Sequence, residues 1–332
     1  MKMQQTIASV NPFVVRRQKY YWGLFIMLEV ELDIFSGRPN PKWILSETEE
    51  KELLKIITSD PTQISPVYTP EEEFGLGYRG FIVREIKTDE GIWSRTNREM
   101  ESPLPMEFRV GSKPAKQALA TEWLLQTSEK KNSKVTDNLR EEAASGVVLL
   151  PSPTEVVDPT IDTSSEVSES MVCASMYYNN NVTAFNEPHQ IANNNCYAFA
   201  SNHLGGGRWA HPGLRGGRPA RENTCSEVMG GLYADGWSHH CSPSSLNVLM
   251  IGCVIKPGGP LDSDFHFYRL VTDGSHGALW GHKPGATPAK NRDDCGRLIG
   301  LGYDPRTICR GRYTEFCGFF YHNGPVVFVK SY

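Results

Sequence analysis

Cysteine and histidine are absent from the first 170 residues of this 332-residue chain, and all eight cysteines and all nine histidines follow Ser170. These side chains most readily act as nucleophiles, acid–base groups and soft metal ligands near neutral pH. Their absence excludes thiol and imidazole chemistry from the first half. If the protein is an enzyme, we expect the second half to carry the active site.

Long apolar runs and a strong excess of one charge are also absent. No apolar stretch reaches the roughly 18 to 20 residues that a membrane-spanning helix requires, so we predict no membrane span. The net charge of −4 gives no electrostatic basis for binding nucleic acid, and we predict no specific nucleic-acid partner. With 39% apolar residues, the chain has enough material for a folded core.

The N-terminus lacks a clear signal peptide. A short apolar stretch, 20–28, follows basic residues but has no small-residue cleavage site and runs into Glu29 and Glu31. Apolar and charged residues alternate over 28–34, which predicts a β-strand with one apolar face. Met27 is an alternative start, and we treat 1–26 as an N-terminal extension.

We predict an α+β protein with a small accessory domain at 27–126, a low-complexity linker at 127–184 and a larger domain at 185–332. Ser46 and Glu49 form a capping-box pattern that predicts the start of a helix. The linker is rich in polar residues and proline, and it has no aromatic residue up to Ser170. The other elements expected in the accessory domain are strands at 78–86 and 106–110 and a helix at 114–126.

A cysteine lies at the predicted start of a helix in the larger domain. Asn195 suits the N-cap position before Cys196, and the glycines at 205–207 suit the helix end. At such a position the helix dipole and the free backbone N–H groups lower a cysteine pKa and favour the thiolate. A buried structural cysteine is the alternative interpretation.

Two histidines follow on predicted antiparallel strands. His266 lies in the strand expected at 264–271, and His282 ends the strand expected at 279–282. His266 is placed to act as general base for Cys196, with His282 holding its imidazole by a hydrogen bond. Asp264 is the alternative orienting residue. The other strands expected in this sheet are 247–255, 313–321 and 326–330.

The series Asn195-Cys196-Tyr197-Ala198-Phe199-Ala200, then His266, then His282 resembles the papain-like cysteine hydrolases, in particular the NlpC-type and CHAP-type amidases and peptidases. The resemblance implies a cysteine-bearing helix packed on an antiparallel sheet over 185–330. It also implies that Cys196 is the nucleophile, His266 the base and His282 the orienting residue. The aspartate-cysteine-serine-glycine string common in NlpC-type enzymes is absent.

The sequence also offers candidates for an oxyanion hole and for a substrate groove. An oxyanion hole needs a donor beside the backbone N–H of the cysteine, and Gln190 and Asn194 are the candidates. The spacing of Gln190, six residues before the cysteine, resembles that in papain. Aromatic residues are candidates for a substrate groove, with packing in the core as the alternative. They are Trp209, Tyr268 and Trp280.

The other cysteines have competing uses. With Cys196 free, at most three disulfides can form; Cys173 is the natural unpaired cysteine, and Cys317 is expected to pair with an earlier one. The cysteine count favours an oxidising compartment, whereas the missing signal peptide favours the cytoplasm. Four residues could instead bind zinc, but the sequence lacks the repeated Cys-x-x-Cys pair typical of zinc sites. We therefore predict no metal and no cofactor. These four are Cys225, His239, His240 and Cys241.

We therefore predict a thiol-dependent hydrolase that cleaves a peptide or related amide bond through an acyl-enzyme. An acyl transferase would use the same residues. The alternative from another class is a non-enzymatic, disulfide-stabilised secreted binding or effector module, in which Cys196 is bridged. The oligomeric state is left open.

Overall fold

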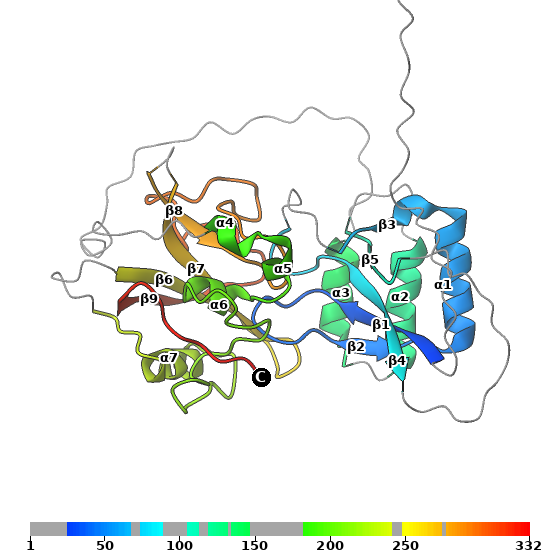
Figure 1. Ribbon diagram of the computed structural model, residues 1–332, viewed down its shortest axis with the longest axis horizontal. Coiled ribbons are helices and arrows are strands. Elements are labelled where there is room, and N and C mark those ends of the chain that lie inside the picture. The colour runs from blue at the N-terminus through cyan, green and yellow to red at the C-terminus, as the bar shows by residue number, and fades with distance from the viewer. Residues whose placement is uncertain are drawn as a thin grey trace, which may run out of the picture.

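The computed structural model describes residues 25–67, 74–88, 105–112, 119–131, 134–146, 182–240, 248–273 and 277–332. Helices combine with two antiparallel sheets, which confirms the predicted α+β class. Each sheet belongs to one of two modules that lie side by side (Figure 1). We call 25–146 the N-terminal module and 182–332 the C-terminal module. Within the described ranges, no helix combines the length and the apolar character needed to cross a membrane.

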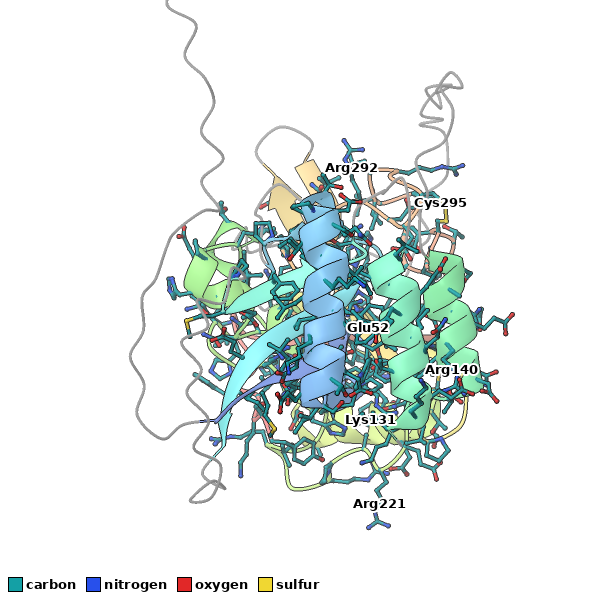
Figure 2. All side chains as sticks on the ribbon, turned by 90° about the vertical axis from the view of Figure 1, so that its right-hand side faces the viewer. Glu52, Lys131, Arg140, Arg221, Arg292 and Cys295 are labelled. Carbon is teal, nitrogen blue, oxygen red and sulfur yellow. A yellow bond between two sulfur atoms is a disulfide. The ribbon has the colours of Figure 1, made fainter. Side chains whose placement is uncertain are left out.

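The N-terminal module has a five-stranded sheet in the order β2-β1-β4-β5-β3. Three helices lie along one face of this sheet (Figures 1 and 2), and their apolar side chains share one core with the strands. The strands are β1 (Phe25–Leu32), β2 (Lys42–Ile44), β3 (Ile64–Ser65), β4 (Phe81–Thr88) and β5 (Glu107–Val110), and a short 3-10 turn, Pro61–Gln63, precedes β3. The helices are α1 (Glu47–Ser59), α2 (Leu119–Lys130) and α3 (Asp137–Gly146).

Local sequence signals place several of these elements correctly. Ser46 is the N-cap of α1, and Glu49 completes the predicted capping box by accepting from the Ser46 backbone. The alternation that begins at Leu28 forms β1, where Val30 and Leu32 are buried. These signals work because they depend only on neighbours along the chain.

Helix α3 lies inside the range predicted to be a linker, and that part of the prediction is wrong. Its Leu139 and Ala143 are fully buried in the N-terminal core together with Val135. Leu139 and Ala143, four residues apart, form a narrow apolar stripe on the helix, and Val135 lies just before it; this suffices once a sheet covers the stripe. The part of the predicted linker at 147–181 lies outside the described residues.

The C-terminal module has a four-stranded antiparallel sheet in the order β8-β7-β6-β9. Its strands are β6 (Val248–Lys256), β7 (Asp264–Asp273), β8 (Gly277–His282) and β9 (Glu315–Asn323). Its helices are α4 (Val182–Phe185), α5 (Pro188–Ile191), α6 (Cys196–Ala200) and α7 (Cys225–Ala234). The strand expected at 326–330 does not form: only an isolated bridge between Ala210 and Ser331 occurs near it.

The two faces of this sheet are covered differently. Phe265 and Phe267 of β7 pack with α6 in one core cluster. Tyr268 and Trp280 pack on the other face against the long loop 284–314, which joins β8 to β9. Because successive side chains of a strand point to opposite faces, odd-numbered residues of β7 face α6 and even-numbered residues face the loop.

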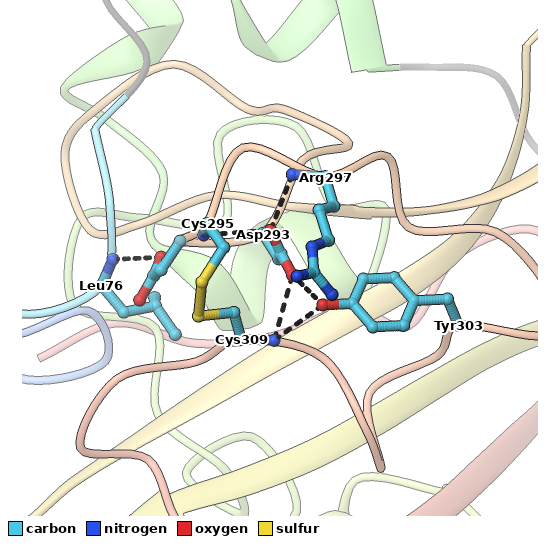
Figure 3. Close-up of a disulfide and its surroundings, with 7 residues drawn as sticks. Leu76, Asp293, Cys295, Arg297, Tyr303 and Cys309 are labelled. Carbon is cyan, nitrogen blue, oxygen red and sulfur yellow. Dashed lines mark hydrogen bonds between the residues drawn. A yellow bond between two sulfur atoms is a disulfide. The ribbon is translucent and has the colours of Figure 1, made fainter. Parts of the chain in front are cut away.

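Two disulfides occur among the described cysteines. Cys225 of α7 is bonded to Cys317 of β9, which confirms the expectation that Cys317 pairs with an earlier cysteine. Cys295 and Cys309 close part of the 284–314 loop. Figure 3 shows Asp293 beside this bridge, where its carboxylate accepts from the backbone N–H groups of Cys295, Arg297 and Cys309 and from the Tyr303 hydroxyl. The carboxylate thus organises the loop that the disulfide closes.

Candidate functional site

Cys196 is the first residue of α6, as the sequence predicts. The Asn195 side chain caps the helix by accepting from the Ala198 N–H at 3.1 Å. The same side chain donates to the carbonyls of Gly37 and Ala210, at 3.1 and 2.8 Å. One asparagine therefore caps the helix and also ties it to the N-terminal module.

The expected lowering of the Cys196 pKa is wrong. The thiol is fully buried and donates to the Phe265 carbonyl, with an S···O distance of 3.8 Å. Burial raises its pKa well above the ordinary value, and the negative charge of Asp264 adds to that rise. A helix of five residues has too small a dipole to oppose both effects. The resting group is a neutral, free thiol, so the expectation that Cys196 of a binding module is bridged is wrong.

His266 and His282 form the pair that the sequence predicts on neighbouring strands. Their rings meet with 2.9 Å between His266 Nε2 and His282 Nδ1. His282 Nε2 lies 2.8 Å from the Arg292 carbonyl oxygen. Since a carbonyl only accepts, His282 Nε2 carries the proton, its Nδ1 accepts, and His266 Nε2 donates.

Both imidazoles are neutral in the folded protein. Burial is the main cause that lowers the pKa of His282 to about 3 and moves that of His266 well below its ordinary value. His266 Nδ1 is therefore an unprotonated base, and it has no hydrogen-bond partner among the described residues. The neighbour therefore holds His266 in the tautomer that leaves Nδ1 free to accept a proton, while burial weakens it as a base.

No hydrogen bond joins Cys196 to His266 in the described part of the chain. Phe265, whose carbonyl holds the thiol, lies in the core shared with α6, whereas the imidazole of His266 is on the face that carries Tyr268 and the 284–314 loop. The thiol of α6 thus contacts the backbone of β7 at Phe265, and the imidazole of the next residue, His266, lies on the opposite face of the strand. They would have to move toward each other before a proton could pass between them.

Asp264 does not orient either histidine. Its carboxylate accepts from the backbone N–H groups of Ser36 and Gly37, at 2.6 and 3.2 Å, and from the Tyr313 hydroxyl at 2.6 Å. Burial is the main cause that raises its pKa, and these three hydrogen bonds oppose the rise. Asp264 joins the two modules instead.

The two oxyanion candidates are engaged with each other. The Asn194 amide donates to the backbone carbonyl and to the side-chain oxygen of Gln190, at 3.0 and 2.8 Å, and its own oxygen accepts from Gly205. Asn194 therefore has no free donor to offer. The role of Gln190 stays a prediction.

Two of the three groove candidates are core residues. Tyr268 and Trp280 are fully buried, and Tyr268 stacks on the His282 ring. The groove prediction is wrong for both because the loop 284–314 covers that face of the sheet. Trp209 is half-buried, and the Arg208 guanidinium lies over its ring.

The state of the other cysteines bears on the zinc candidates and on the number of free thiols. Cys225 is in a disulfide, which removes one of the four residues considered for zinc. Cys253 is a second free and buried thiol. The described residues contain no group of three or more His, Cys, Asp or Glu suited to a metal ion. Cys173 and Cys241 lie outside the described residues.

Sequence reasoning missed the loop 36–40 and Lys283. The loop reads as a turn that ends a strand, and nothing in it signals contact with a residue more than 200 positions away. Lys283 follows β8, is fully buried and donates to the carbonyls of Ile191 and Gly285. Burial lowers its pKa well below the ordinary value. A lysine beside a proline and a glycine gives no sign of such burial.

Comparison with known proteins gives one informative match. No model of a known protein family matches the chain, and no solved structure matches it. "Insoluble matrix shell protein 1" of Ruditapes philippinarum is 40% identical over 125 residues, which cover 38% of this chain and 76% of that relative. Identity at this level over most of the relative shows common descent. The chain therefore belongs to the family of insoluble matrix shell protein 1.

Proposed function

We propose that this protein is a non-enzymatic, disulfide-stabilised module that acts as a constituent of an extracellular matrix. The observation that carries the proposal is the 40% identity to a relative whose name describes an insoluble matrix shell protein. Two features of the chain support it. Two disulfides are typical of an oxidising, secretory environment, and the thiol and both imidazoles are closed off from solvent.

Fractionation of the native protein tests this proposal. An antibody raised against the folded chain would follow the protein through successive extractions of the source tissue with salt, denaturant and reductant. We expect the protein outside cells, in the fraction that resists salt. Recovery of the whole amount in the cytosolic extract, with its cysteines reduced, would contradict the proposal.

A second function, thiol-dependent hydrolysis of a peptide or related amide, is favoured by one observation. His266 Nδ1 is an unprotonated base without a partner among the described residues, and His282 holds that tautomer. In the proposed reaction, His266 Nδ1 takes the Cys196 proton and the sulfur attacks the carbonyl carbon. The departing amine receives that proton, and water then cleaves the thioester. An amine in place of water would give acyl transfer.

Paired cysteine variants test this second function. New amino groups released from a mixture of denatured proteins would be measured for the wild type, Cys196→Ala and Cys253→Ala. Both residues are free, buried thiols, so the second variant controls for loss of a buried thiol. Hydrolysis predicts activity that disappears only with Cys196. Equal activity in all three proteins, or none in the wild type under conditions that expose the thiol, would reject it.

A further inference from the structure

The loop Ser36–Asn40 between β1 and β2 is built by the N-terminal module but buried in the C-terminal one. Its shape comes from Asn40, whose side-chain oxygen accepts from the backbone N–H groups of Ile34 and Phe35 at 3.1 and 2.8 Å. The Asn40 amide donates in turn to Glu31 and Asp33. Ser36 and Gly37 at its tip are buried. The loop is therefore a preformed projection.

The tip of this loop contacts the residues that flank both Cys196 and His266. Asp264, two positions before the histidine, accepts from the backbone N–H groups of Ser36 and Gly37. Asn195, one position before the cysteine, donates to the Gly37 carbonyl at 3.1 Å. The loop thus spans the start of α6 and the start of β7 at once.

The fit at Gly37 leaves no room for a side chain. A Cβ at this position would lie 2.3 Å from the ring of Phe265, the residue whose carbonyl holds the thiol. Arg38 fastens the loop from outside, because its guanidinium donates to the carbonyls of Pro260 and Ser263 at 2.7 and 3.0 Å. Separable contacts thus fasten the loop to the residues next to a free, buried thiol.

We propose that the loop Ser36–Asn40 is an intramolecular latch that seals the Cys196 thiol, and that the thiol becomes accessible when the loop leaves Asp264 and Asn195. The N-terminal module is then a regulator of the thiol as well as a structural partner. This inference does not rest on either proposed function. A matrix protein would keep the thiol from oxidation or mispairing, and a hydrolase would keep it inactive.

Alkylation of the folded, full-length protein with iodoacetamide tests the latch. Peptide mass spectrometry would give the labelling rates of Cys196 and Cys253 in the same sample. Cys253 is also free and buried, but it lies in the middle of β6, so it reports general unfolding. In the wild type we expect both thiols to react far more slowly than in the denatured chain.

Two variants loosen the loop to different degrees. Arg38→Ala removes two hydrogen bonds at the rim of the loop. We expect it to raise the labelling rate of Cys196 about tenfold, because losing the stabilisation of one net hydrogen bond, or slightly more, makes the open loop about ten times more populated. Gly37→Ala forces the loop off Phe265, and we expect a larger rise. Arg221→Ala removes an exposed side chain that extends away from the molecule (Figure 2) and should change neither rate.

The ratio of the two rates decides the outcome. A rise of Cys196 labelling with unchanged Cys253 labelling supports the latch. The proposal is overturned if Cys196 is already as reactive in the wild type as in the denatured chain, if neither loop variant changes its rate, or if both cysteines rise together. If Gly37→Ala does not fold, the labelling rates of Arg38→Ala alone decide between these outcomes.

Discussion

At the scale of single residues, burial decides the charge of the Cys196 thiol and of the two paired imidazoles. Cys196, His266 and His282 are each fully buried, and in each the pKa moves in the direction that favours the neutral form. The sequence predicts the order of these residues and the pairing of the histidines. It does not reveal their burial, because that comes from the core that packs around Cys196 and from the loop 284–314 that covers the histidines.

The depressed pKa of His282 predicts an acid-sensitive fold. The unfolded chain binds a proton near the ordinary histidine pKa of 6.5, whereas the folded chain binds it only near 3. The unfolded state therefore gains protons first, and the stability that His282 contributes is lost as pH falls from 6.5 toward 3. Between pH 7 and pH 4 this amounts to as much as about 3 kcal/mol.

We expect His282→Gln to remove part of this pH dependence. The measurement is the free energy of unfolding in urea at pH 7 and at pH 4. The difference between the two values should be smaller in His282→Gln than in the wild type, even though the variant is less stable at pH 7. His189→Gln, at an exposed position of α5, is the control and should keep the wild-type difference. An unchanged difference in His282→Gln would show that other groups cause the acid sensitivity.

At the scale of elements, a short helix depends on one side chain. Asn195 caps α6 and donates to the carbonyls of Gly37 and Ala210. Loss of a cap costs about 1 kcal/mol, and each buried hydrogen bond adds about 1 kcal/mol. We therefore expect Asn195→Ala to lower the free energy of unfolding by about 3 kcal/mol in urea denaturation.

The neighbouring Asn193 provides a matched control for that variant. It is exposed, and its amide donates only to the His189 carbonyl at the surface. Asn193→Ala should cost less than about 0.5 kcal/mol. Similar losses in the two variants would mean that Asn195 does not have the special role that its three contacts indicate.

Elements specified by local patterns could be predicted, and those specified by tertiary contact could not. The capping box at Ser46, the N-cap at Asn195 and the alternation of β1 depend on residues within one or two turns of each other. Helix α3 is held by an apolar stripe that needs the N-terminal sheet to cover it. The strand expected at 326–330 has the right residues, but these align with no neighbouring strand among the described ones.

At the scale of the whole molecule, the two disulfides close loops of very different length. Cys225 and Cys317 are 92 residues apart, and Cys295 and Cys309 are 14 apart. The entropy of the unfolded chain is reduced more by the longer loop, by about 4.5 kcal/mol against about 3 kcal/mol. We expect the double variant Cys225→Ala/Cys317→Ala to be less stable than Cys295→Ala/Cys309→Ala, as measured by thermal unfolding. The reverse order would show that the short loop matters through its contacts with Asp293.

A buried ion pair joins the modules. Lys256 of β6 donates to Glu142 of α3 at 2.5 Å, and both side chains are buried. Removing one partner leaves an unpaired charge in the interior, so Glu142→Met should cost about 3 kcal/mol. The double variant Glu142→Met/Lys256→Met should recover most of that loss in urea denaturation. A double variant as unstable as the single one would mean that shape, rather than charge, is what the pair supplies.

The sequence by itself determined the local structure and the positions of the reactive residues: the cap before Cys196, the strands that carry His266 and His282, and the restriction of both residue types to the second half. Only the tertiary structure decided what these residues can do. Asp264 binds Ser36, which is 228 positions away, rather than a histidine. Contacts over such distances arise from tertiary packing, and tertiary packing sets the burial and the pKa of the thiol.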